Sequence, residues 1–101
     1  MKKTFPFTEA GKADARVIEA IKADVRRYVK RERRKPLPTG ADLWTFSCAV
    51  GDSQSSAQPK TLTEVSRAID EIAASGSPSV YIEVVASAGN HPPRQDRLPA
   101  S

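Results

Sequence analysis

Apolar residues between positions 12 and 34 recur at steps of one, three and four, which is the spacing of one face of an α-helix. The stripe consists of Val17, Ile18, Ile21, Val25, Tyr28 and Val29. No Gly or Pro interrupts the run before Pro36, and the residue before a proline disfavours the helical conformation. We therefore predict a helix over residues 12 to about 34. Glu32 falls within the apolar stripe, so contact with the core is expected to end near Val29.

Two later segments alternate between apolar and other residues, which is typical of half-buried strands. In residues 42–51 one face carries Trp44, Phe46, Cys48 and Val50. In residues 79–87 one face carries Val80, Ile82 and Val84. The segment "KTFPF", residues 3–7, is compatible with a short edge strand, because proline is tolerated in a sheet only at an edge.

A second helix is predicted between these two strands. Thr61 and Glu64 have the spacing of a capping box, which marks a helix start. The apolar stripe of this helix is Leu62, Val65, Ile69 and Ile72. Gly76 is well placed to end it. Residues 52–59, "DSQSSAQP", are expected to form a polar, flexible loop.

These elements predict an α+β fold with the order (β)αβαβ, in which two helices pack on a small two- or three-stranded sheet. If the last two strands are neighbours, their helical crossover makes them parallel and right-handed. The 101 residues are expected to form a single compact domain over residues 1–87. Residues 88–101 contain two adjacent prolines and no apolar periodicity, which favours a disordered tail.

The positive charge is concentrated in one segment of the chain. Residues 22–35 contain eight basic and two acidic residues, a net charge of +6. The whole chain has a net charge of +4, so the remainder has −2. A localised field of this kind attracts phosphates or other anions.

The basic residues of the first predicted helix are therefore the candidate binding residues, and the steps of four, four and three from Lys22 to Arg33 place several of them opposite the apolar stripe. They are Lys22, Arg26, Arg27, Lys30, Arg31, Arg33, Arg34 and Lys35. The leading hypothesis is non-catalytic nucleic-acid binding, with RNA or the ribosome as the favoured partner and DNA as an open alternative. Residues 12–35 contain no Asn or Gln for adenine readout, so contacts to phosphates and low sequence specificity are expected. The alternative is a protein-interaction module that binds an acidic partner, without nucleic acid.

The sequence offers little for catalysis or for a cofactor. His91 is the single histidine and lies in the predicted tail, where a catalytic base would not be held in place. Cys48 is the single cysteine and lies on an apolar strand face, so a packing role is expected. One Cys and one His do not make a structural zinc site. We expect no enzyme activity, no metal, no cofactor, no membrane span and a cytoplasmic location.

Three segments of the chain resemble a family of small bacterial proteins of unknown function. They are "MKKTFPF" at the start, "KRERRKPLPTGADLWTFSC" in the middle and the βαβ half that follows, so the resemblance covers about residues 1–87. Members of that family tend to have acidic residues around the Phe of the strand, where this chain has Thr45 and Ser47. A metal-binding role of those acids is therefore not expected to carry over. The resemblance implies a cytoplasmic bacterial protein and supplies no catalytic residues.

Overall fold

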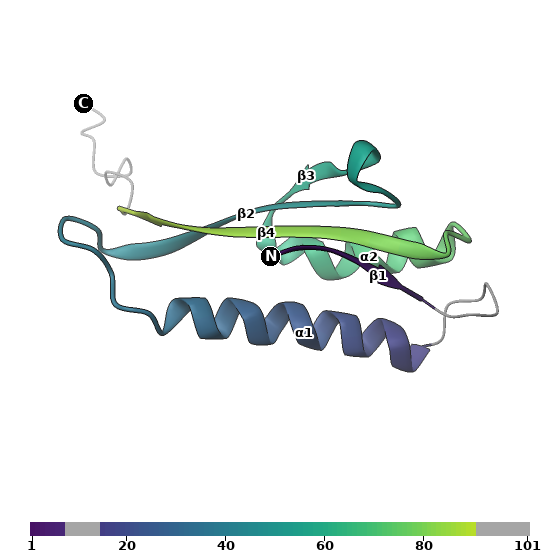
Figure 1. Cartoon of the computed structure of the whole chain (residues 1–101), viewed down its shortest axis with the longest axis horizontal. Helices are drawn as coiled ribbons and strands as arrows, with labels where there is room; N and C mark the ends of the chain where they lie inside the picture. The colour runs from purple at the N-terminus through teal and green to yellow at the C-terminus, as the bar shows by residue number, and fades with distance from the viewer. Residues whose placement is uncertain (8–14, 91–101) are drawn as a thin grey trace, which may run out of the picture.

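A computed structural model describes residues 1–7 and 15–90 and has an α+β fold. Both helices lie on the same face of a four-stranded sheet (Figure 1). The elements are β1 (Lys2–Pro6), α1 (Ala15–Arg33), β2 (Leu43–Gly51), β3 (Gln58–Lys60), α2 (Val65–Ala74) and β4 (Ser79–Gly89), with short 3-10 turns η1 (Gln54–Ser56) and η2 (Leu62–Glu64). The strand order across the sheet is β1-β4-β2-β3. The predicted edge strand near the N-terminus is confirmed.

The sheet has four strands, whereas two or three were predicted. Residues 58–60 form β3 and pair with Cys48, Ala49 and Val50 of β2, although residues 58 and 59 were predicted to end a flexible loop. This strand is short and polar, with Pro59 at its centre, so it has no apolar alternation to reveal it. It forms because the turn η1 folds the chain back along β2 at the edge of the sheet, where proline is tolerated.

The prediction that the last two long strands are parallel was wrong. β4 pairs with β2 in the antiparallel direction over the full length of β2. The unrecognised strand β3 explains this, because it reverses the chain direction before α2 begins. The helical crossover therefore joins β3 to β4, which run in the same direction on either side of β2.

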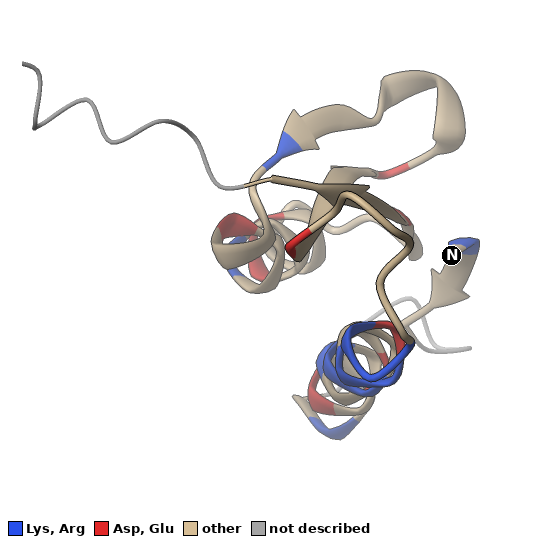
Figure 2. Cartoon of the chain, turned by 90° about the vertical axis from the view of Figure 1, so that its left-hand side faces the viewer, with Lys and Arg blue, Asp and Glu red and all other residues tan. Residues whose placement is uncertain are grey.

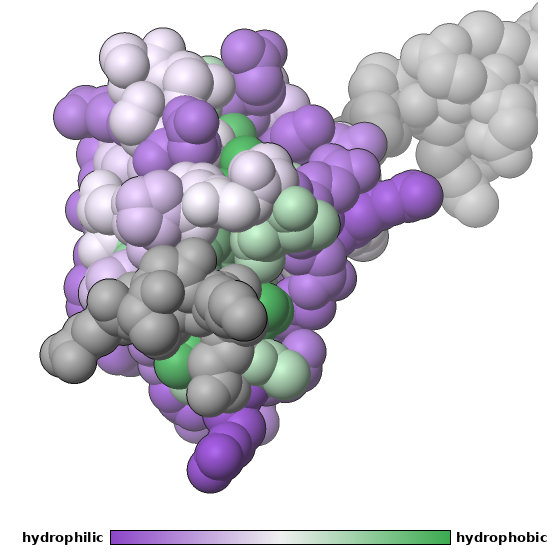
Figure 3. Space-filling view, turned by 90° about the vertical axis from the view of Figure 1, so that its right-hand side faces the viewer, coloured by the Kyte–Doolittle hydropathy of each residue, from purple (hydrophilic) through white to green (hydrophobic). Residues whose placement is uncertain are grey.

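The core lies between the sheet and the helix layer. The strands contribute Phe5, Cys48, Val50, Val80, Ile82 and Val84; the helices contribute Ile21, Val25, Val29, Val65, Ala68 and Ile69; Phe7 follows β1. Val29 is the last buried residue of α1, as the position of Glu32 predicted. Seen from the end that carries the α2–β4 turn, hydrophobic residues show in patches among hydrophilic ones (Figure 3). The apolar faces of the sheet and of the two helices therefore pack against one another in the core.

The ends of the second helical segment follow the predicted signals. The N–H of Thr61 donates a hydrogen bond to Glu64 Oε1 at 2.8 Å, and this bond lowers the pKa of the Glu64 carboxyl. The first turn is the 3-10 turn η2, and α2 continues from Val65. Gly76 has a φ of 86°, the left-handed conformation that a helix stop requires, and its N–H donates to Ala73 O at 3.2 Å.

The last strand is longer than predicted. β4 continues to Gly89, two residues past the expected end at residue 87, because Leu43 and Trp44 of β2 pair with Gly89 and Ala88. The remainder of the predicted tail, residues 91–101, lies outside the described residues. So does the first part of the predicted helix, residues 12–14.

Candidate functional site

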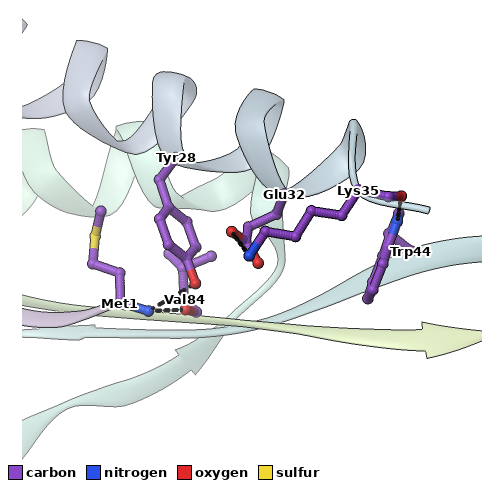
Figure 4. Close-up of polar contacts among 6 residues, drawn as sticks. All are labelled: Met1, Tyr28, Glu32, Lys35, Trp44 and Val84. Carbon is purple, nitrogen blue, oxygen red and sulfur yellow. Dashed lines mark hydrogen bonds and ion pairs between the residues drawn. The ribbon is translucent and has the colours of Figure 1, made fainter. Parts of the chain in front are cut away.

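The C-terminal end of α1 is held against the sheet by β2. Trp44 Nε1 donates a hydrogen bond to the backbone carbonyl of Lys35 at 3.0 Å. The guanidinium of Arg33 lies over the Phe46 ring, 5.3 Å from its centroid. Figure 4 shows how Trp44 reaches from the sheet to the chain that leaves α1. The last turn, which carries much of the positive charge, is therefore fixed in place.

Nearer the N-terminus of α1, Tyr28 joins one flank of the helix to the sheet. Its hydroxyl accepts a hydrogen bond from the Met1 ammonium at 3.1 Å, and that ammonium also donates to Val84 O at 2.6 Å (Figure 4). One flank of the helix is thus tied to β1 and β4. The opposite flank faces α2.

The basic residues of α1 divide between these two flanks. Viewed along α1 from its C-terminal end, the Lys and Arg residues gather on this helix (Figure 2). On the α2 side, Arg26, Lys30, Arg33 and Arg34 line a groove of about 550 Å³ between the helices. On the β1 side, Arg27 and Arg31 line a smaller hollow of about 350 Å³. Arg26, Lys30 and Arg33 were predicted to lie opposite the apolar stripe. In the structure they lie instead on the flank of α1 that faces α2.

Lys22 differs from the other predicted binding residues. Its ammonium lies 2.8 Å from Asp70 Oδ1 of α2 and 3.5 Å from Glu19 Oε2, and only 11% of its side chain is exposed. The hydrogen bond to Asp70 raises the pKa of Lys22 above its ordinary value. Lys22 follows the buried Ile21 directly, which directs it towards the neighbouring helix. It joins α1 to α2, and we exclude it from the binding face.

Replacing Asp70 by Asn is expected to lower the free energy of unfolding by about 1 kcal/mol. This value lies between those of exposed and buried ion pairs, because the Asp70 side chain is 56% exposed whereas that of Lys22 is mostly buried. The pair raises the folded-state pKa of Lys22, so its contribution is full below the ordinary value of 10.5 and is lost as pH rises through the folded-state pKa. Urea unfolding near pH 7 and near pH 11 measures this difference.

The matched control for that prediction is Glu71→Gln, which removes a neighbouring exposed carboxylate of α2. This variant should unfold like the wild type at both pH values. If Asp70→Asn is equally neutral near pH 7, the contact does not join the helices.

The remaining predicted residues fall into paired and unpaired groups. Arg27 pairs with Asp24 on the same helix, and Lys35 pairs with Glu32 at 2.8 Å. Within residues 1–7 and 15–90, no carboxylate lies within ion-pair distance of the other five, which are Arg26, Lys30, Arg31, Arg33 and Arg34. All five are exposed. These five residues together are called the unpaired basic face.

The groove between the helices was missed in the sequence analysis. Its floor comes from two helices that are far apart in the chain, so no local pattern indicates it. The one sequence signal was Leu62, an apolar residue at the very start of the second helical segment. In the structure Leu62 is half-buried and lines the groove beside Val65.

Other kinds of site receive little support in the described part of the chain. Cys48 is buried, and burial raises the pKa of its thiol, which disfavours the reactive thiolate. No group of three or more potential metal ligands occurs among residues 1–7 and 15–90. His91 lies outside the described residues. Within the described ranges, neither helix has the length and apolar character needed to cross a bilayer.

The chain belongs to a family of unknown function (DUF6172), whose sequence profile matches residues 1–95. The expected membership in a family of unknown function is thereby confirmed, and the match extends beyond residue 87. No curated protein and no solved structure matches the chain.

Proposed function

We propose that this protein is a non-catalytic nucleic-acid-binding domain that contacts phosphates through α1. The observation that carries the proposal is the unpaired basic face: five cations within nine residues, without a carboxylate partner in the described ranges. The helix macrodipole favours cations near a helix C-terminus, by about 0.3–1 kcal/mol each. That effect accounts for two or three cations in the last turn, but not for this number.

The electrostatic argument concerns the cost of gathering like charges. Seven of the ten residues 26–35 are basic, and only Glu32 is acidic. Glu32 is already paired with Lys35, so it offsets little of the repulsion among the others. A phosphate backbone converts that repulsion into attraction, because each neutralised phosphate releases bound counterions.

The chemistry of α1 favours contacts to the backbone of a nucleic acid over base readout. The described part of α1 has no Asn or Gln, so bidentate adenine recognition is not available from it. Arg and Lys in a dense field mainly contact phosphates. RNA and duplex DNA are therefore both candidate ligands, with low sequence specificity. A cytoplasmic location forms part of this proposal and agrees with a single cysteine that is unpaired.

Competition separates this function from binding to an acidic protein. The full chain is immobilised, and labelled RNA is bound to it at low salt. A purified acidic protein is then added at a concentration that matches its carboxylate charges to the phosphate charges of the RNA. We expect RNA to stay bound. Complete displacement by the acidic protein, or no binding of RNA or duplex DNA at about 50 mM salt, would contradict the proposal.

A further inference from the structure

The groove between α1 and α2 has an apolar floor beneath a charged rim. Its volume of about 550 Å³ is within the range of ligand sites, roughly 300–1,000 Å³. The apolar lining residues are Val25, Val29, Leu62, Val65 and Ile69. Four of these side chains are core residues that are at most 6% exposed, so the accessible apolar surface of the groove comes mainly from the half-buried Leu62. The aliphatic stems of the Arg and Lys side chains extend the apolar wall, with the charged ends towards water.

The charge of the groove is one-sided. The wall formed by α1 and the residue after it carries Arg26, Lys30, Arg33 and Arg34, whereas the polar residue of the α2 wall is Ser66. Lys22 also lines the groove, but its charge is balanced by Asp70. A complementary occupant would therefore have an apolar strip for the floor and negative charges along one edge only.

We propose that this groove binds an acidic amphipathic helix of a partner protein. The cations at positions 26, 30 and 33 recur at steps of four and three, the same spacing that places side chains along one edge of a helix. From Arg26 to Arg33 they extend over about 10 Å of α1. Acidic residues spaced by three and four on a bound helix would meet them in sequence, while its apolar residues cover the floor.

The distribution of the cations favours a helix over a small amphiphile such as a fatty acid. A single carboxylate head would be held best by cations gathered at one end of the groove. These cations are spread along one whole wall. A nucleic acid would satisfy the cations but would leave Leu62 and the aliphatic stems of the groove in contact with water. The inference goes beyond the proposed nucleic-acid function: both ligands would use the cations of this wall, but only the helix would depend on Leu62.

The test selects helical peptides from a display library on the immobilised full chain. The library has randomised positions on an otherwise helix-favouring sequence of about 18 residues, long enough to span the groove. We expect enrichment of apolar residues at i, i+3 or i+4 and i+7, with Asp or Glu along one edge. Amide chemical shifts of the full chain with the best peptide should change at the groove residues and not at Arg27.

Variants of the full chain then test how much the apolar floor and the basic wall of the groove each contribute to peptide affinity, with one control outside the groove. Leu62→Gln and Lys30→Glu should each weaken the selected peptide about tenfold or more, which corresponds to about 1.4 kcal/mol. Arg27→Gln, on the β1 flank, is the control and should change affinity less than twofold. Leu62→Gln keeps every charge and should leave RNA binding unchanged, so failure of this inference is distinguishable from failure of the nucleic-acid proposal.

Three results would overturn the inference. The first is enrichment of peptides without an acidic edge, and the second is wild-type affinity for the peptide in both Leu62→Gln and Lys30→Glu. The third is displacement of the peptide by dodecanoate with shifts at the same groove residues, which would assign the groove to a single-headed amphiphile. Because Leu62→Gln could disturb folding, the amide spectrum of each variant is compared with the wild type, and Lys30→Glu provides the exposed second change.

Discussion

Changing Arg26, Lys30 and Arg33 together to Gln is expected to remove most of the salt-dependent affinity for nucleic acid. If the five residues of the unpaired basic face each neutralise one phosphate, the logarithm of affinity falls with the logarithm of salt with a slope of about −4.5 for duplex DNA and −3.5 for single strands. From about 50 to 200 mM salt, the wild type then loses roughly a hundred- to five-hundred-fold in affinity. The triple variant should show a slope smaller by about two to three.

The triple variant should keep its helix, because Gln is also a good helix former, and circular dichroism checks this. The matched control replaces Lys2, Lys60 and Arg67 by Gln, which removes the same charge from β1, β3 and α2. This control should nearly retain the wild-type slope. Equal slopes for the wild type and the α1 variant, or equal losses in both variants, would mean that no localised face binds the phosphates.

Replacing Gly51 by Ala is expected to destabilise the fold by about 1–3 kcal/mol, because this site has no room for a methyl group. Gly51 is buried at the end of β2, and an added Cβ would lie 2.7 Å from both the backbone N and Cα of Ala57. Those atoms belong to the backbone that returns from η1 to β3 and do not move aside like a flexible side chain. The melting temperature should fall by roughly 5–20 °C for a domain of this size.

Gly89→Ala is the matched control, because Gly89 also lies in a strand of the same sheet. Among the residues that the structure describes, the added Cβ meets only Thr45 there, with the nearest atom, Cγ2, at the ordinary contact distance of 3.4 Å. The control should stay within about 0.5 kcal/mol of the wild type in urea unfolding. Comparable effects of the two substitutions would show that the turn after β2 relaxes freely, and that β3 is held loosely.

The sequence by itself determined those features that depend on neighbouring residues. Alternation in residues 42–51 and 79–87 predicted both long strands, because side chains on a strand point to opposite faces. The stripe through Ile21, Val25 and Val29 predicted the buried face of α1. The capping pair Thr61 and Glu64, and Gly76 after the second helix, marked the ends of that helical segment. The basic residues of the segment 22–35 predicted a basic helix, because that charge also lies on residues that are close together in the sequence.

The tertiary structure alone decided the features that join distant segments. β3 exists through backbone hydrogen bonds to β2, and it sets the antiparallel direction of β4. Lys22 does not belong to the unpaired basic face, because its ammonium is paired with Asp70, which lies 48 residues later in the chain. The groove combines a wall of α1 with Leu62 and Val65 from the second helical segment. Periodicity describes which way a side chain points within its own element, whereas its neighbour across an interface depends on how the elements pack.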